Sequence, residues 1–205
     1  MFHAVNCRYP ECGKLALFVP GKTFDFCLFH TPEAERETVV SAILSYIMTT
    51  ETIIGVNAGG LKFSGMDLSG KRFYGCSFQH CRWENVKAEE IRSRMSMFDF
   101  TSFTDCTFER SNIRFVSFGC GIFKRVLFTG SDLVYNNFCG VQGSQSSFND
   151  CDLYNSRFIR AGLFHTTFIN SNILNVDFTG LNQNGVVFKQ TNTKGAHGLV
   201  EEKRR

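Results

Sequence analysis

Long apolar stretches are absent from this sequence of 205 residues. A membrane-spanning helix needs about 18 or more consecutive apolar residues, and no such run occurs, so we expect no membrane span. Residues 1–7 also lack the basic segment and apolar core of a secretory signal. Nine cysteines in such a chain indicate free thiols and metal ligands rather than a disulfide framework. These features predict a cytoplasmic protein.

Catalytic motifs are missing as well. The sequence has no nucleophile motif, no glycine-rich phosphate loop and no pair of carboxylates at a catalytic spacing. His80, His165 and His197 stand apart from any acidic, serine or cysteine partner. We therefore expect a protein that is not an enzyme and has no small-molecule substrate.

The sequence does contain a large apolar residue at every fifth position. Of the 26 positions counted in steps of five from Phe63 to Phe188, 22 hold Phe, Leu, Ile or Trp. A helix would scatter these side chains around its circumference, and a regular strand would repeat every second residue. A chain that turns a corner every five residues would instead point each of them inward. The spacing predicts a β-solenoid, in which each short unit buries its apolar face against the next.

Small residues stand two positions before most of these large ones, as a narrow packed interior requires. Where the large position holds a smaller residue, the small position two before it holds a larger one. This exchange pairs Ala88 with Val86, Ser93 with Ile91 and Gly143 with Val141. The register therefore runs unbroken through residues 84–97. Residues of one kind also recur every twenty positions, which indicates four five-residue units per coil; one such set is entirely Phe: Phe78, Phe98, Phe118, Phe138, Phe158 and Phe178.

The recurring pattern, seen as SDLVY at residues 131–135, CDLYN at 151–155 and SNILN at 171–175, resembles the pentapeptide-repeat family. The resemblance covers about two-thirds of the chain. It implies an all-β solenoid, a right-handed four-sided β-helix of about six to seven coils over residues 59–195. It also implies that the large residue and the one two before it point inward.

The best-known members of that family are quinolone-resistance and immunity proteins, which are dimeric rods that imitate DNA and bind DNA gyrase. Such a role needs an acidic surface. Residues 61–195 instead carry fifteen Lys and Arg against eleven Asp and Glu. The sequence therefore favours a protein-interaction scaffold, with the DNA-mimic role as the alternative.

Residues 1–30 contain two closely spaced pairs of metal-ligand residue types, Cys7 with Cys12 and Cys27 with His30. Tetrahedral zinc takes four such ligands, and short pairs place two donors on one turn. The spacing predicts a structural zinc site without an open coordination position, with His3 as an alternative fourth ligand. The other interpretation is that the cysteines are ordinary buried thiols.

Residues 31–58 predict one helix and a linker. Thr31 is a good N-cap, Pro32 suits the first helical position, and apolar residues follow at helical spacing until Thr50. We expect this helix to cover the open N-terminal end of the solenoid, although it could instead bind a partner. Residues 196–205 predict a flexible polar tail.

One outward side of the predicted solenoid combines arginines with large apolar groups. This combination is typical of a protein interface, self-association included, and also of a nucleic-acid surface on which bases stack. A solvated surface, with arginine stems over aromatic rings, is the third possibility. The residues concerned are Arg72, Arg92, Arg94, Arg114, Met95, Phe115 and Tyr135.

Overall fold

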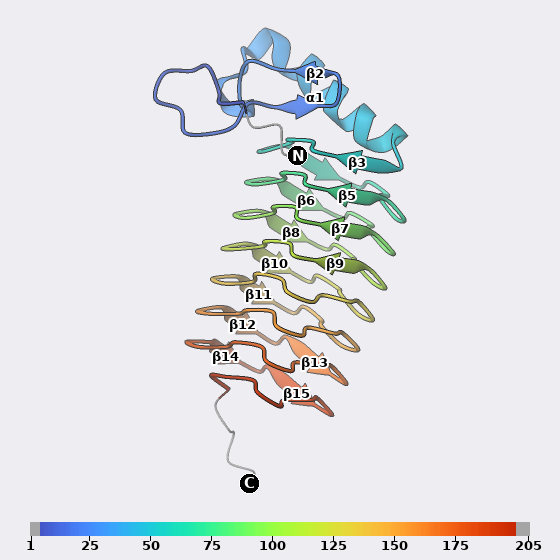
Figure 1. The fold of residues 1–205 in the computed structure, drawn as a ribbon, viewed down its shortest axis with the longest axis vertical. Coiled ribbons are helices and arrows are strands. Elements are labelled where there is room, and N and C mark those ends of the chain that lie inside the picture. Colours follow the sequence, from blue (N-terminus) through green and yellow to red (C-terminus); the bar gives the residue numbers. More distant parts are fainter. Residues whose placement is uncertain (1–4, 200–205) are drawn as a thin grey trace.

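A computed structural model describes residues 5–199 as a rod built from stacked coils, with a small N-terminal segment and one helix at one end (Figure 1). Parallel pairing links positions twenty residues apart, from Thr52 through to Asn192. This interval of 140 residues corresponds to seven turns of twenty. The predicted β-solenoid and its twenty-residue coil are confirmed.

The strands are short and lie on the flat sides of the coils (Figure 1). One side forms a seven-stranded parallel sheet of β4 (Lys62–Ser64), β6 (Arg82–Glu84), β8 (Ser102–Thr104), β10 (Ile122–Lys124), β11 (Gln142–Ser144), β12 (Gly162–Phe164) and β14 (Asn182–Asn184). A second side contains β3 (Thr52–Ile54), β5 (Arg72–Tyr74), β7 (Arg92–Arg94) and β9 (Asn112–Arg114). Near the C-terminal end, β13 (Thr167–Ile169) pairs with β15 (Val187–Lys189).

The solenoid begins earlier than the predicted residue 59. Strand β3 already pairs in register with β5, and Ile53 and Ala58 are fully buried in the large inward positions. This first coil is hard to recognise in the sequence, because Ala58 is small for a large inward position and two glycines follow it.

The helix α1 (Glu33–Thr49) lies across the N-terminal end of the rod, as expected (Figure 1). Its buried residues Val39, Ile43 and Ile47 join the core of the solenoid. Thr31 is not the N-cap, because its hydroxyl donates to the Cys27 carbonyl at 3.0 Å and Pro32 takes the cap position. Among residues 5–199, no helix is long and apolar enough to cross a membrane.

Large inward side chains fill the rod. Phe118 and Phe138, one coil apart, stack with their ring centroids 5.1 Å apart. Where the large position is Gly143, an added Cβ would lie 2.9 Å from Leu163 Cδ2, so neighbouring side chains already occupy the space. Val141, which is fully buried, supplies the missing volume, as the exchange of sizes predicted.

Every coil turns its corners in the same way. At every fifth position from Gly55 to Gly195, two residues after the large one, the backbone φ is positive. Glycine adopts this conformation readily, whereas bulky residues seldom do. Side chains at these corners therefore project from the edges of the rod.

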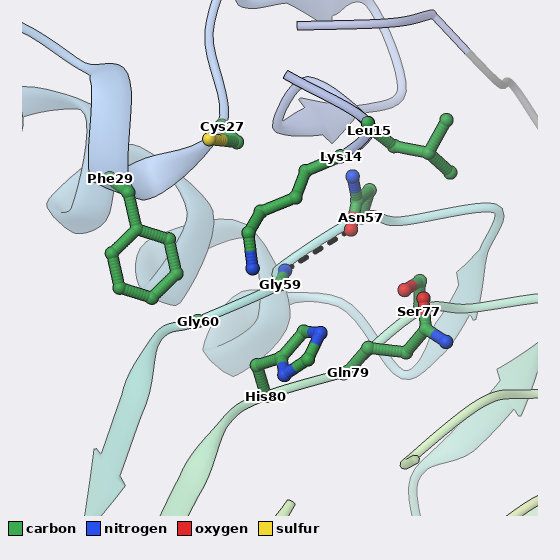
Figure 2. Close-up of a pocket in the computed structure, with 11 residues that line it drawn as sticks. Lys14, Leu15, Cys27, Phe29, Asn57, Gly59, Gly60, Ser77, Gln79 and His80 are labelled. Atoms are coloured by element: carbon green, nitrogen blue, oxygen red, sulfur yellow. Dashed lines mark hydrogen bonds between the residues drawn. The ribbon is translucent and has the colours of Figure 1, made fainter. Parts of the chain in front are cut away.

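The N-terminal segment lies over the first coils. It includes the antiparallel pair β1 (Phe18–Val19) and β2 (Lys22–Thr23) and the 3-10 helix η1 (Leu28–His30). The amide of Asn57 in the first coil donates to the Ala16 carbonyl at 2.6 Å. Between the segment and the first two coils lies a cavity of about 140 Å³ (Figure 2).

Candidate metal centre and exposed corner ladders

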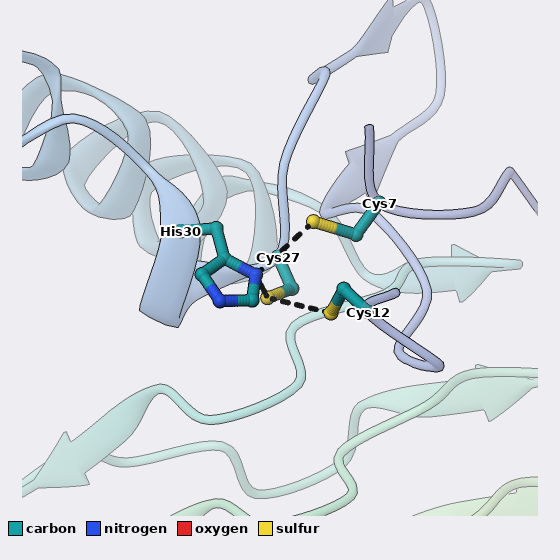
Figure 3. Close-up of side chains that lie close together, drawn as sticks. All are labelled: Cys7, Cys12, Cys27 and His30. Atoms are coloured by element: carbon teal, nitrogen blue, oxygen red, sulfur yellow. Dashed lines mark hydrogen bonds between the residues drawn. The ribbon is translucent and has the colours of Figure 1, made fainter. Parts of the chain in front are cut away.

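The structure brings the four predicted metal ligands together (Figure 3). Their ligand atoms all lie within 4.8 Å of one another. His30 Nδ1 is 3.5 Å from the sulfur of Cys7 and 3.5 Å from that of Cys27, and the sulfurs of Cys12 and Cys27 are 4.0 Å apart. With Zn–S bonds of about 2.3 Å, the sulfurs of a tetrahedral site lie about 3.8 Å apart. The arrangement therefore has the dimensions of a zinc site.

Local hydrogen bonds hold these ligands in place. The Cys7 amide donates to the Lys14 carbonyl at 2.9 Å, and the Cys12 amide closes a turn onto Tyr9. Cys27 immediately precedes η1 and His30 ends it, so one short turn presents both groups. The Tyr9 ring stacks on His30 with centroids 3.9 Å apart, which fixes the plane of the imidazole.

The environment favours the thiolate at Cys7. Burial acts to raise the pKa of this thiol, but hydrogen bonds from the backbone amides of Cys27 and Tyr9 and from His30 lower it to about 6. Burial raises the pKa of Cys27. His3, the alternative fourth ligand, lies outside the described residues.

The arginines of the predicted interaction face are mostly engaged within the rod. Arg72 forms an ion pair with Glu51 at 3.4 Å, and Arg114 pairs with Asp132. Arg94 Nη1 donates to two backbone carbonyls, each at 3.0 Å. Arg92 lies between Arg72 of the preceding coil and Asn112 of the next. Its side chain has no partner among residues 5–199.

Large side chains at the corners of this face are exposed. Met95 is 61% exposed, Phe115 57% and Tyr135 45%. Phe115 and Tyr135 stack with centroids 5.1 Å apart, and Tyr154 meets Tyr135 edge to face at 5.6 Å. We call the three residues Met95, Phe115 and Tyr135 the first corner ladder. All three have positive φ, from 49° to 58°, a conformation that is strained for bulky side chains.

A second corner ladder was missed by the sequence reasoning. His80 and Phe100, one coil apart, stack with centroids 5.0 Å apart, and Phe100 is 56% exposed. The exposed Cys120 continues the same corner into the next coil. The ladder could have been found in the sequence by following one corner position, two residues after a large inward residue, from coil to coil in steps of twenty residues.

Comparison with known proteins matches one family, described as "Pentapeptide repeats (8 copies)", to residues 122–160. No curated protein matches the chain.

Among solved structures, a trypsin-treated form of QnrB1, a plasmid-mediated fluoroquinolone resistance protein, is 22% identical, with a TM-score of 0.41, over 65% of this chain and 83% of that one. Rfr23, a pentapeptide repeat protein from the cyanobacterium Cyanothece 51142, is 9% identical, with a TM-score of 0.33, over 72% of this chain and 98% of that one. A pentapeptide repeat protein from the Arabidopsis thaliana thylakoid lumen is 22% identical, with a TM-score of 0.30, over 60% of this chain and 68% of that one.

The family match and the fold agree with each other, since residues 122–160 lie within the twenty-residue coils described above. Residues 122–160 are therefore similar to pentapeptide repeats, and the same five-residue register runs through the other coils of the β-solenoid.

Proposed function

We propose that this protein is a non-enzymatic protein-interaction scaffold, in which a rigid rod presents the first corner ladder and a structural zinc holds the N-terminal segment. The observation that carries the proposal is the exposure of Met95, Phe115 and Tyr135 at strained corners. Large apolar groups fixed on a rigid support lose little conformational entropy on binding and serve as anchors in protein interfaces.

The charges beside this ladder favour a protein partner over a nucleic acid. Three of the four arginines are engaged by acidic groups or by backbone carbonyls. Binding a phosphate backbone depends on several cations that are free to replace counterions. Arg92, which has no side-chain partner within the described part of the chain, suits the rim of a protein interface.

The interface is tested by replacing Phe115 and Tyr135 with serine. The purified protein is chemically crosslinked, alone and with host-cell extract, and the crosslinks are located by mass spectrometry. We expect crosslinks beside Met95 in the wild-type protein and none there in this variant. Ile122→Ser is the matched control, because Ile122 is 56% exposed on another side of the rod. Crosslinks beside Met95 that persist in the double variant would contradict the proposed interface. Sedimentation velocity distinguishes a second copy of the chain from a foreign partner.

The zinc is tested separately by elemental mass spectrometry on untagged protein. We expect about one zinc per chain, because the four clustered donors would supply the four ligands of one tetrahedral ion. Cys12→Ser should lose the metal, whereas Cys120→Ser, at an exposed corner, should keep it. A metal-free wild-type protein with an intact N-terminal segment would mean that these cysteines are ordinary buried thiols and not metal ligands.

A DNA-mimic that binds gyrase is the alternative function. That role requires acidic side chains in place of phosphates, and the segment 61–195 carries a surplus of basic residues. We therefore expect no effect of the protein on DNA supercoiling by gyrase in a direct assay.

A further inference from the structure

The cavity between the N-terminal segment and the first two coils (Figure 2) is lined by none of the residues of the first corner ladder. Lys14 and Leu15 line it from the segment, Phe29 from η1, and Ser77, Gln79 and His80 from the second coil. Its volume of about 140 Å³ is close to the roughly 150 Å³ of a protein cavity that holds benzene. A ligand with one ring or a short branched chain therefore fits.

Three polar side chains of the cavity, those of Lys14, Ser77 and His80, form no hydrogen bond or ion pair within residues 5–199. Ser77 is only 4% exposed, yet its hydroxyl forms no hydrogen bond within residues 5–199. Lys14 Nζ lies 4.8 Å from the centroid of the Phe29 ring, and no carboxylate of the described residues pairs with it. Figure 2 shows this ammonium group between Phe29 and His80. The Ser77 hydroxyl, which lines the cavity, is therefore free to donate a hydrogen bond to a ligand there.

The other polar side chains of the wall are already engaged. Asn57 donates to Ala16 and accepts from the Gly59 amide. The Gln79 amide donates at 3.4 Å to Asp99, whose carboxylate also accepts from Ser117 and from the Gly119 amide. The groups left for a ligand among the described residues are thus the Lys14 cation, the Ser77 hydroxyl and the His80 ring, which stacks on Phe100.

The charge of the surroundings limits the ligand to a single negative charge. Burial, together with the nearby charge of Lys14, lowers the pKa of His80, so this ring adds no second cation at neutral pH. A loaded centre of three thiolates, one histidine and Zn²⁺ would carry one net negative charge beside the cavity, because Cys27 lines it. Phosphate groups, with nearly two charges, usually require several cations.

We propose that this cavity binds a carboxylate carried on a small apolar body, with Lys14 as the ionic partner, Ser77 as a hydrogen-bond donor and Phe29 with Leu15 as the apolar wall. The ligand is either a free carboxylic acid or the terminal carboxylate of a peptide. The inference rests on one part of the proposed function, the metal-held N-terminal segment, and not on the corner ladder.

The experiment is a titration of the folded, metal-containing protein with benzoate, followed by NMR signals of the Ser77 amide and the His80 ring. We expect saturable shifts with a Kd on the order of 1 mM. Benzamide, which has nearly the same shape and no charge, should bind at least about tenfold more weakly. Equal binding of the two compounds, or no saturable shift with benzoate, overturns the proposal.

Variants locate the contacts. Lys14→Met keeps most of the apolar stem and should weaken benzoate binding about tenfold or more, and Ser77→Ala about threefold or more. Lys22→Met is the matched control, because Lys22 Nζ also lies over an aromatic ring, that of Phe24 at 5.1 Å, outside the cavity. Unchanged affinity in Lys14→Met would also overturn the proposal.

A peptide with a free terminal carboxylate and an apolar last residue, compared with its amide, separates the two sources. Binding of the free-acid peptide identifies a peptide terminus, and binding of benzoate alone identifies a small acid. Metal content and the NMR signals of residues 5–30 are recorded in each sample. Failure of benzoate to bind a zinc-loaded, folded segment removes the ligand site alone, whereas a metal-free segment removes the zinc proposal.

Discussion

Single side chains in the small inward positions do more than fill space. The Ser111 hydroxyl accepts a hydrogen bond from the Ile91 amide at 3.1 Å and donates to the Ala88 carbonyl at 3.3 Å, both in the preceding coil. The buried corners leave these backbone groups without strand partners, and a hydroxyl satisfies them. This explains why serine and threonine outnumber alanine at these positions, which size alone does not.

Two serine variants test this role of the hydroxyl. Ser111→Ala should lower the free energy of unfolding by about 1–3 kcal/mol, because two buried backbone groups lose their partner. Ser93 is equally buried, but its hydroxyl has no partner within the described chain. Ser93→Ala should therefore be neutral or stabilising in the same denaturant titration. Equal losses in both variants would contradict this account.

The inward register is tested by one charge in two environments. Phe118→Asp should abolish cooperative folding, because an unpaired carboxylate would lie in the dry stack of rings. Phe115→Asp, three residues earlier and 57% exposed, should leave the fold intact. Circular dichroism and chemical unfolding measure both, and a soluble, cooperatively folded Phe118→Asp would show that the register is wrong.

At the scale of elements, the N-terminal segment and α1 form one unit over the first coil. The segment has little core of its own, so we expect the four clustered ligands to hold it through a metal. The helix, in contrast, buries Val39, Ile43 and Ile47 directly against the solenoid. The two elements should therefore differ in how they respond to loss of metal.

Chelation measured by hydrogen exchange tests this difference. Removal of zinc should speed amide exchange at Cys7 and Leu17 about tenfold or more, because the local structure that protects them opens. Exchange at Phe118 in the middle of the rod should not change. Uniform acceleration along the chain would mean that the metal supports the whole fold.

At the scale of the whole molecule, the two ends of the rod differ. Helix α1 covers the first coil, whereas in the last described coil Leu181, Val186 and Phe188 are only partly buried. Solenoids are stabilised by nearest-neighbour contacts, so a coil with one neighbour is less stable than one with two.

Native-state hydrogen exchange should reveal this asymmetry. The amides of Val187 and Asn192, which are bonded to the preceding coil, should exchange faster than those of Ser117 and Phe118. Fraying at the uncovered end requires no opening of the middle coils. Equal protection at both places would indicate that something covers the C-terminal end in solution.

Much of this architecture could be predicted from the sequence, because inward packing leaves its mark at fixed spacing. The exchange of size between Gly143 and Val141 and the grouping of the four metal-ligand residues were both anticipated. The pairing of Arg114 with Asp132 was not, because it joins neighbouring coils diagonally, at positions 18 rather than 20 residues apart. In the basic strip expected from the sequence, Arg72 and Arg114 are ion-paired and Arg94 is held by backbone carbonyls. The first coil was missed because Ala58 is too small to mark the period.

The uniform corners have a consequence for how this chain can change in length. Each side of a coil is five residues long, so a deletion of one residue would turn every later inward side chain outward. Losing five would keep the interior but rotate all later ladders by a quarter turn around the rod. Only twenty residues, one full coil, can be lost or gained with every exposed ladder still aligned. With its ladders kept aligned, the rod can therefore change in length only by whole coils, each of which adds about 4.8 Å, the spacing between neighbouring strands.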